Sequence, residues 1–359
     1  MILRKIFSVL IALLLFLTLS LPCFAEPDVS AKAAVVICAD SHEVIYSKNA
    51  DERLPMASTT KIMSSLIALE MGADDTLVTV TDEMIRAEGT SRGLKGGDSV
   101  STLSLVKGML LSSGNDAANA TAFLMAGGID PFVELMNKRA QEIGMKNTHF
   151  VTPSGLDADG HYSTAYDMAI LADDAIKNQT FLNICSSKSV DVFFGSPPYK
   201  RILNNHNKLL SICDGVVGVK TGFTKKSGRC LVSAMKKDGK SLIAVTLAAP
   251  NDWEDHMKLY DYALSVAKSV SLFCNLDNVY LKVVGGQDRK VGVSFADNIF
   301  YTTLNSNFTY NYKIYIKQFE YAPVLKGETV GRVDFYCCDG KLIKSVDLVA
   351  AKDVLSIHG

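Results

Sequence analysis

Neither a surplus of charge nor a metal-binding cysteine pattern is found in the sequence. The 37 lysine and arginine residues are nearly balanced by 38 aspartate and glutamate residues, so the formal net charge is -1. Nucleic-acid-binding proteins generally present a concentrated basic surface, and this balance gives no reason to expect a nucleic-acid partner. Cys-x-x-Cys pairs and the cysteine–histidine spacings typical of zinc are absent, so no metal site is expected.

A disulfide framework, internal repeats and low-complexity tracts are lacking as well. Removal of an N-terminal segment that contains Cys23 would leave an odd number of cysteines, which argues against complete pairing. The remaining features are typical of a packed globular protein. The chain has 359 residues, of which 48% are hydrophobic and 21% charged, and this length is enough for two domains.

The N-terminus has the pattern of an export signal. Two basic residues precede an apolar run over residues 6–19, and Ala25 stands at a suitable cleavage point, which predicts a signal peptide of residues 1–25. An uncleaved anchor is the rival interpretation, since the run is near the lower length limit for a spanning helix. A lipoprotein attached through Cys23 is disfavoured by Pro22, where lipidation signals require a very small residue.

Hydrophobic periodicity predicts an α+β first domain over residues 26–270. Strand patterns occur at residues 33–47 and 216–248, with a hairpin signal at Asp238-Gly239. Between these two strand regions, helical patterns occur over residues 58–69, 103–111, 117–125, 131–143 and 165–176. One more helical pattern, over residues 252–267, follows the second strand region. We therefore expect an antiparallel sheet with helices on both faces and a helical insert between its outer strands.

A small all-β domain is predicted over residues 276–359. Short alternating runs appear there, at residues 279–284, 291–295, 312–319, 330–336 and 342–349. Asp339-Gly340 is a further hairpin signal. The domain boundary is expected near residues 268–278.

The first chemical motif is Ser58-Thr59-Thr60-Lys61. Side chains three positions apart share one face of a helix, so Lys61 can lie beside the Ser58 hydroxyl. A serine becomes a good nucleophile when a base takes its proton, and a lysine can serve if burial or nearby cations lower its pKa. In isolation the same pattern is typical of a helix-capping serine and a surface lysine.

Two further motifs follow in the chain. Ser113-Gly114-Asn115 precedes a helical pattern, where a turn can direct a proton-relaying hydroxyl and an amide at one cleft. Lys220-Thr221-Gly222 ends an apolar strand and offers a charge, a hydroxyl and a close backbone approach, followed by the N–H of Phe223 as an oxyanion donor. Each pattern alone fits a helix-capping turn or an ordinary strand end.

The conjunction of the three motifs is much more specific than any one of them. They occur in the order known for β-lactamases and penicillin-binding proteins. The chain resembles the low-molecular-mass penicillin-binding proteins, the D-alanyl-D-alanine carboxypeptidases of serine peptidase family S11, over about residues 31–350. The likeness extends to Leu110–Ala118, Gly155-Leu156-Asp157 and Asn205–Leu210, and residues 249–256 are most similar to the sporulation-associated branch.

The resemblance implies a β-lactamase/transpeptidase-like catalytic domain and a role for each motif residue. Ser58 would be the acylated nucleophile, Lys61 the general base and Ser113 a proton relay. Asn115, Lys220, Thr221, Gly222 and Phe223 would bind substrate, with the N–H groups of Ser58 and Phe223 as the oxyanion hole. No metal or cofactor is implied. The expected partners are peptidoglycan stem peptides and, as covalent inhibitors, β-lactams.

Several positions depart from the family pattern. Phe223 stands where many relatives have histidine, and Ser154 where a histidine often precedes Gly155. No arginine follows near residues 253–256 to hold the substrate carboxylate, so Lys220, Thr221 or Arg229 must compensate. Residues 350–357 are too short for the amphipathic membrane-binding helix of relatives. We expect an exported protein released outside the membrane, with peripheral membrane or wall association.

Two other functions fit parts of the pattern. A class A-like β-lactamase needs a carboxylate in the loop between the second and third motifs, and residues 152–165 supply Asp157 and Asp159 but no glutamate. A β-rich domain is also foreign to those enzymes. A non-catalytic wall-binding module is the second rival, against which the intact Ser58 and Lys61 argue.

Overall fold

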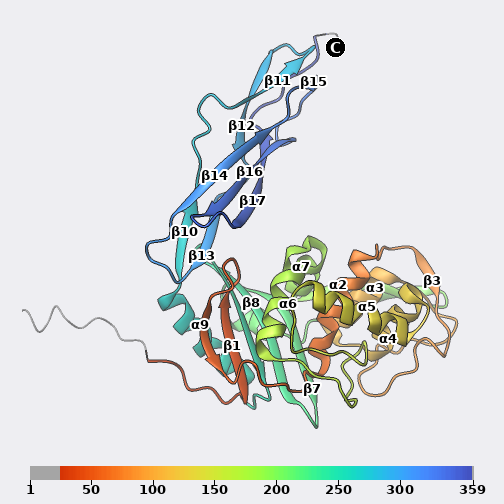
Figure 1. The fold of residues 1–359 in the computed structure, drawn as a ribbon. Helices are drawn as coiled ribbons and strands as arrows, with labels where there is room; N and C mark the ends of the chain where they lie inside the picture. The colour runs from red at the N-terminus through yellow and green to blue at the C-terminus, as the bar shows by residue number, and fades with distance from the viewer. Residues whose placement is uncertain (1–24, 358–359) are drawn as a thin grey trace, which may run out of the picture.

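The N-terminal domain is built on a five-stranded antiparallel sheet in the computed structural model, which describes residues 25–357 (Figure 1). The strand order is β2-β1-β9-β8-β7. The strands are β1 (Ala33–Cys38), β2 (Val44–Lys48), β7 (Val216–Thr224), β8 (Gly228–Lys237) and β9 (Lys240–Leu247). The Asp238-Gly239 turn joins β8 and β9 as predicted.

Both faces of this sheet are covered, which explains the continuous apolar sequence of β1. Every residue of β1 is buried, and its side chains alternate between two hydrophobic cores. Ala33, Val35 and Ile37 pack in the core that includes α6 (Ala165–Lys177), whereas Ala34, Val36 and Cys38 face the core beneath α9 (Asp252–Val266). The predicted α+β class and the helices on both faces are confirmed.

The helical insert lies between β2 and β7 and forms the right-hand part of the molecule in Figure 1. Besides α6 it contains α2 (Lys61–Glu70), α3 (Thr102–Ser112), α4 (Asn115–Ala126), α5 (Ile129–Glu142), α7 (Gln179–Ser186) and α8 (Leu209–Ile212). The helix expected from Ser58 starts instead as a 3-10 turn, η1 (Ala57–Thr60). Ala57 enters this turn with a φ of 49°, and α2 follows it directly.

A second, four-stranded sheet was not predicted. It has the order β3-β4-β5-β6, with β3 (Leu77–Thr79), β4 (Ser99–Ser101), β5 (Ser189–Gly195) and β6 (Pro198–Asn204). The first two strands have three residues each, too few to show an alternating pattern. This sheet packs against α3, which carries the second motif at its C-terminal end.

The C-terminal part, from Lys268 onward, is all β, as predicted, and extends as an elongated arm away from the first domain (Figure 1). A six-stranded sheet has the order β14-β16-β17-β12-β11-β15, and β10 pairs with β13. The strands are β10 (Lys268–Leu272), β11 (Tyr280–Val284), β12 (Lys290–Phe295), β13 (Ile299–Thr303), β14 (Tyr310–Ile316), β15 (Glu320–Tyr321), β16 (Thr329–Cys337) and β17 (Leu342–Ala350). Strands β10 and β13 were not predicted.

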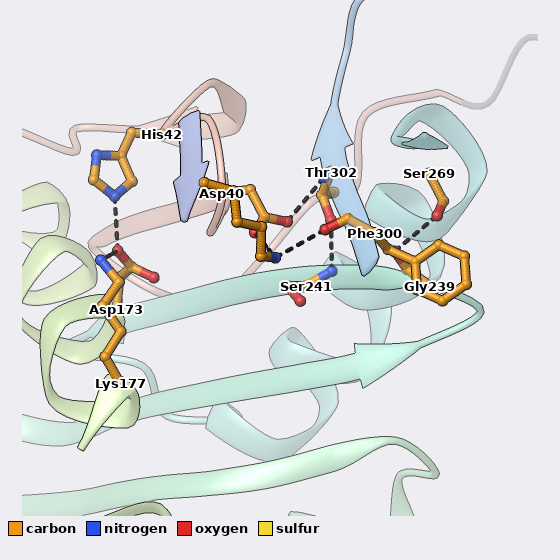
Figure 2. Close-up of polar contacts among 10 residues, drawn as sticks. Asp40, His42, Asp173, Lys177, Gly239, Ser241, Ser269, Phe300 and Thr302 are labelled. Atoms are coloured by element: carbon orange, nitrogen blue, oxygen red, sulfur yellow. Dashed lines mark hydrogen bonds and ion pairs between the residues drawn. The ribbon is translucent and has the colours of Figure 1, made fainter. Parts of the chain in front are cut away.

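Polar contacts join the two domains where β13 meets the five-stranded sheet (Figure 2). Asp40, in the β1–β2 turn, accepts a hydrogen bond from the Thr302 amide at 2.8 Å and another from Lys344 at 3.2 Å. The Thr302 hydroxyl accepts from the Ser241 amide at 2.7 Å. Thr302 is fully buried, so these bonds fix β13 of the arm at the end of the sheet where β9 begins.

The predicted signal peptide lies outside the described residues except for Ala25. Between residues 25 and 357, no helix is both long enough and apolar enough to span a bilayer.

Candidate active site

Ser58 and Lys61 lie side by side at the junction of η1 and α2. The Lys61 side-chain nitrogen lies 2.9 Å from Ser58 Oγ, within hydrogen-bond distance, and donates a hydrogen bond to Asn115 Oδ1 at 2.7 Å. It also donates to the backbone oxygen of Ser154 at 2.5 Å. Lys61 is fully buried, so three fixed oxygens hold its nitrogen against the serine hydroxyl. The structure thus brings together the first pair of predicted residues.

The second motif lies at the turn between α3 and α4. Ser113 ends α3 in the left-handed conformation, with a φ of 60°, and its side chain reaches the cleft that contains Ser58. Asn115 begins α4 and is buried. Its amide nitrogen donates to the Glu88 carbonyl at 2.6 Å, which fixes the amide orientation that presents Oδ1 to Lys61.

The third motif runs along β7, next to η1. Lys220 is 1% exposed and donates to the Thr221 carbonyl at 2.8 Å. Gly222 lies against the backbone of the first motif, since a Cβ at this position would be 3.1 Å from the Ser58 amide nitrogen. A Cβ here would be closer to these backbone atoms than most Cβ contacts are, so glycine favours the close approach of β7 to η1, which places Thr221 and Phe223 beside the nucleophile.

The electrostatics of the site favour an uncharged lysine. Burial holds the pKa of Lys61 well below its ordinary value; the charges of Lys220 and Arg92 lower it further, while Asp116 opposes them. Burial, assisted by Arg92, lowers the pKa of Lys220 to about 7. A neutral amine 2.9 Å from Ser58 Oγ can accept the serine proton.

A cleft of about 290 Å³ opens above these residues. Five predicted residues line it, namely Ser58, Ser113, Thr221, Gly222 and Phe223. The other three, Lys61, Asn115 and Lys220, are buried behind its wall. A larger hollow of about 910 Å³ lies at the domain junction, but its lining includes none of the three motifs.

The cleft also contains residues outside the predicted site. Thr90, His206, Asp252 and Trp253 line it, together with Arg229, which the sequence offered as a substitute for the missing arginine. Arg229 is held by Asp252, with 2.8 Å between Nη2 and Oδ1, and its guanidinium carbon lies 5.5 Å from the centre of the Trp253 ring. His206 belongs to the Asn205–Leu210 segment that resembles the family, whereas no sequence pattern marked Thr90.

The comparisons with known proteins agree with this geometry. Residues 23–251 match the family model described as D-alanyl-D-alanine carboxypeptidase, and residues 271–356 match that of the penicillin-binding protein 5 C-terminal domain. The chain is 32% identical to D-alanyl-D-alanine carboxypeptidase DacF of Bacillus subtilis, over 98% of this chain and 95% of that protein. It is 30% identical to DacA of Escherichia coli, over 91% of this chain and 84% of that protein.

Solved structures of carboxypeptidases and penicillin-binding proteins are also similar to this chain. The carboxypeptidase DacD from Francisella tularensis matches with a TM-score of 0.62 and 29% identity, covering 92% of this chain and 95% of that one. Penicillin-binding protein 5 from Haemophilus influenzae matches with a TM-score of 0.65 and 28% identity, covering 92% and 99%. The chain belongs to the D-alanyl-D-alanine carboxypeptidase family of serine peptidases and carries the C-terminal β domain of penicillin-binding protein 5.

Proposed function

We propose that the protein removes the terminal D-alanine from peptidoglycan stem pentapeptides through an acyl-enzyme on Ser58. The observation that carries this proposal is the 2.9 Å contact between Ser58 Oγ and the nitrogen of the fully buried Lys61, at the floor of an open cleft. Family membership supports both the reaction and the substrate class.

The first step is attack of Ser58 Oγ on the carbonyl carbon of the penultimate D-alanine. Neutral Lys61 takes the serine proton as the C–O bond forms, and the N–H groups of Ser58 and Phe223 donate to the oxyanion. The C–N bond then breaks, and the leaving nitrogen receives a proton through Ser113. Water hydrolyses the ester in the second step, which releases the shortened peptide and restores the Ser58 hydroxyl.

The substrate's free carboxylate needs a cation at the far end of the cleft. We assign this role to Arg229, with the Thr221 hydroxyl as a second donor. Arg229 is on β8, opposite Phe223 of β7, and Asp252 and Trp253 hold its side chain in place. It would supply the charge expected from an arginine farther along the chain in relatives. Lys220 is buried behind Thr221 and contributes a charge without direct exposure to the cleft.

β-Lactams would acylate Ser58, and the resulting acyl-enzyme would hydrolyse slowly. A class A-like β-lactamase requires a carboxylate that activates water against the ester. In the loop of residues 152–165, Asp157 accepts a hydrogen bond from Thr224 at 3.0 Å, and Asp159 is exposed. The carbonyl of Ser154 from the same loop contacts Lys61. This arrangement supports a peptidase more than a β-lactamase.

The setting of the enzyme is also a proposal. Family members act on the cell wall, so the protein is expected to work outside the cytoplasm after cleavage at Ala25, with peripheral membrane or wall association. The division into domains at residues 26–270 and 276–359 stays a prediction. Strand β10 begins at Lys268, within the expected boundary zone, and pairs with β13 of the C-terminal arm.

Labelled penicillin tests the acyl-enzyme. Peptide mapping should place a single adduct on Ser58 in the folded protein, and none should form in a Ser58→Ala variant. Absence of an adduct on the wild type would favour a non-catalytic wall-binding module. Rapid steady-state turnover of a chromogenic cephalosporin would instead identify a β-lactamase.

A further inference from the structure

Residues 29–31, just ahead of the first strand, are fixed to the start of α9. Asp255, in the first turn of that helix and 1% exposed, accepts hydrogen bonds from the Ser30 amide at 2.9 Å and from Ser30 Oγ at 2.7 Å. It also accepts from the Ala31 amide at 3.1 Å. Val29 and Ala31 are themselves buried in the core beneath α9. One buried carboxylate therefore joins the helix to a segment near the other end of the domain's sequence.

The start of α9 is held by this segment and not by a cap of its own. Asn251 is the N-cap residue, and its side chain makes no capping hydrogen bond within the described part of the chain. The Asn251 amide instead donates to Ser30 Oγ at 3.0 Å. Because the first turn of a helix lacks a full set of internal hydrogen bonds, contacts from outside help to set where the helix begins. The Ser30 hydroxyl thus bridges Asn251 and Asp255 and holds the turn in one position.

The same turn carries the residues that hold Arg229 in the cleft. Asp252, 2% exposed, contacts Arg229 through Oδ1, at 2.9 Å from Nε and 2.8 Å from Nη2. Its Oδ1 also accepts from the Trp253 amide at 2.9 Å, and the Trp253 ring lies against the guanidinium. The Arg229 carbonyl accepts from the Ala249 amide at 2.8 Å, in the loop that leads into α9. A shift of the first turn would therefore move the guanidinium.

Arg229 depends on this turn for its position. Its side chain is 41% exposed, and Asp252 is its one ion-pair partner within residues 25–357. A long, exposed side chain has many rotamers, and fixing it in one of them costs free energy when a ligand binds. Contacts that fix the guanidinium beforehand reduce this cost. These contacts begin at residues 29–31 and reach the cleft through α9.

We propose that Asp255 is a positioning residue for recognition of the substrate carboxylate. Through Ser30 and Ala31 it fixes the first turn of α9, and that turn presents Arg229 to the cleft. Asp255 is not one of the cleft-lining residues, so it acts on the substrate through its neighbours. The inference rests on the proposed function, because it takes Arg229 as the cation that binds the carboxylate. It gives residues 29–31, which belong to none of the three motifs, a part in substrate selection.

The first test follows the turn without using activity. Trp253 is the single tryptophan of the chain, so its fluorescence reports directly on the first turn of α9. In Asp255→Asn the quenching of this fluorescence by acrylamide should increase, because the turn opens more readily. Glu254→Gln removes a negative charge from the same turn, where Glu254 pairs with Lys258, and should leave the quenching unchanged. Unchanged quenching in Asp255→Asn would overturn the inference.

The second test measures kcat/KM for an acyl-D-Ala-D-Ala peptide and for the same peptide with a C-terminal amide. In Asp255→Asn the ratio of the two values should fall about threefold to tenfold, because a misplaced Arg229 binds the carboxylate less well. The loss should arise mainly in KM, and the amide should be hydrolysed at the wild-type rate. Equal losses for both peptides would mean that Asp255 only stabilises the fold and would overturn the inference.

Ser30 provides a milder variant. Ser30→Ala removes the hydroxyl bonds to Asp255 and from the Asn251 amide but leaves both backbone donors to the carboxylate. It should lower the same ratio by about twofold to fivefold. Ser30→Thr keeps the hydroxyl and should retain the wild-type ratio. If Asp255→Asn does not fold, an unchanged ratio in Ser30→Ala would overturn the inference.

Arg229→Gln, measured beside these variants, separates the inference from the proposed function. A fall of the ratio in Arg229→Gln but not in Asp255→Asn would overturn the inference alone. No fall in Arg229→Gln would overturn the assignment of the carboxylate to Arg229, and the inference with it. If the wild type hydrolysed neither peptide, the proposed function would fail, while the Trp253 fluorescence would still decide whether Asp255 fixes the turn.

Discussion

Gly222 approaches Ser58 so closely that a Cβ on the glycine would lie 3.1 Å from the Ser58 amide nitrogen and 3.0 Å from the Met56 carbonyl oxygen. This contact joins β7 to the nucleophile-bearing turn and sets the separation of the two proposed oxyanion donors. Both neighbours are backbone atoms, which cannot move aside as the end of a flexible side chain can.

Gly222→Ala should therefore displace β7 from η1. We expect acylation by penicillin to fall about tenfold to a hundredfold, because small misplacements of catalytic groups have large effects on rate. Stopped-flow acylation measures the effect. Gly292→Ala, on β12 of the arm, provides a control for the substitution itself because no atom lies within 4 Å of the added Cβ and the backbone is not in the left-handed region, and the two variants should differ clearly in rate.

The buried Lys220 should lower the free energy of unfolding near neutral pH, because burial disfavours its charged form. Its pKa of about 7 in the folded protein is far below its ordinary value of 10.5, so between these pH values the unfolded chain binds more protons. The contribution of Lys220 to stability therefore rises with pH from about 7 to 10.5. Lys220→Met should increase the free energy of unfolding at pH 7 by about 1–4 kcal/mol and remove activity. Urea unfolding at pH 7 measures this free energy, and a Lys220→Met variant less stable than the wild type would contradict the prediction.

Arg229→Gln should weaken recognition of the substrate carboxylate. The loss of one charged hydrogen-bonding partner is worth about 1.5–3 kcal/mol, so kcat/KM for an acyl-D-Ala-D-Ala peptide should fall about tenfold to a hundredfold. The same peptide with a C-terminal amide lacks the charge, and the variant should hydrolyse it at the wild-type rate. Equal losses for both peptides would show that Arg229 acts on the site in another way.

Asp40→Ala should uncouple the two domains without an effect on catalysis. The substitution removes the bonds to the Thr302 amide and to Lys344, which leaves a buried N–H unsatisfied at a loss of about 1–3 kcal/mol. Calorimetry should show a wider separation between the unfolding transitions of the catalytic domain and the β arm. An unchanged thermogram would mean that the junction is held by other contacts.

The sequence predicted the central sheet well because its strands are long and buried on both faces. It did not predict the sheet of β3 to β6, in which β3 and β4 are too short for a periodic signal, or the strands β10 and β13, whose pairing depends on the arm's arrangement. The 3-10 turn at Ser58 was predicted as α-helix, since side chains three positions apart are neighbours in both structures.

The site was predicted as far as its residues belong to local motifs. Ser58, Lys61 and Asn115 form one hydrogen-bonded cluster, as the conjunction of the first two motifs indicated. Arg92 and Thr90 could not be found in this way. Their loop approaches the cleft through a tertiary contact, the bonds to the buried Asp116 and from the Asn115 amide to the Thr90 carbonyl, which leaves no local pattern.

Release of free D-alanine from a diacyl-Lys-D-Ala-D-Ala peptide tests the central claim most directly. The chain from residue 26 onward would be compared with Ser58→Ala and with Ser65→Ala, a matched control because Ser65 is a buried serine of α2 whose hydroxyl has no partner among residues 25–357. The account predicts release by the wild type and by Ser65→Ala, and none by Ser58→Ala. Release by Ser58→Ala at the wild-type rate, or no release by a wild type that still forms the penicillin adduct, would contradict it.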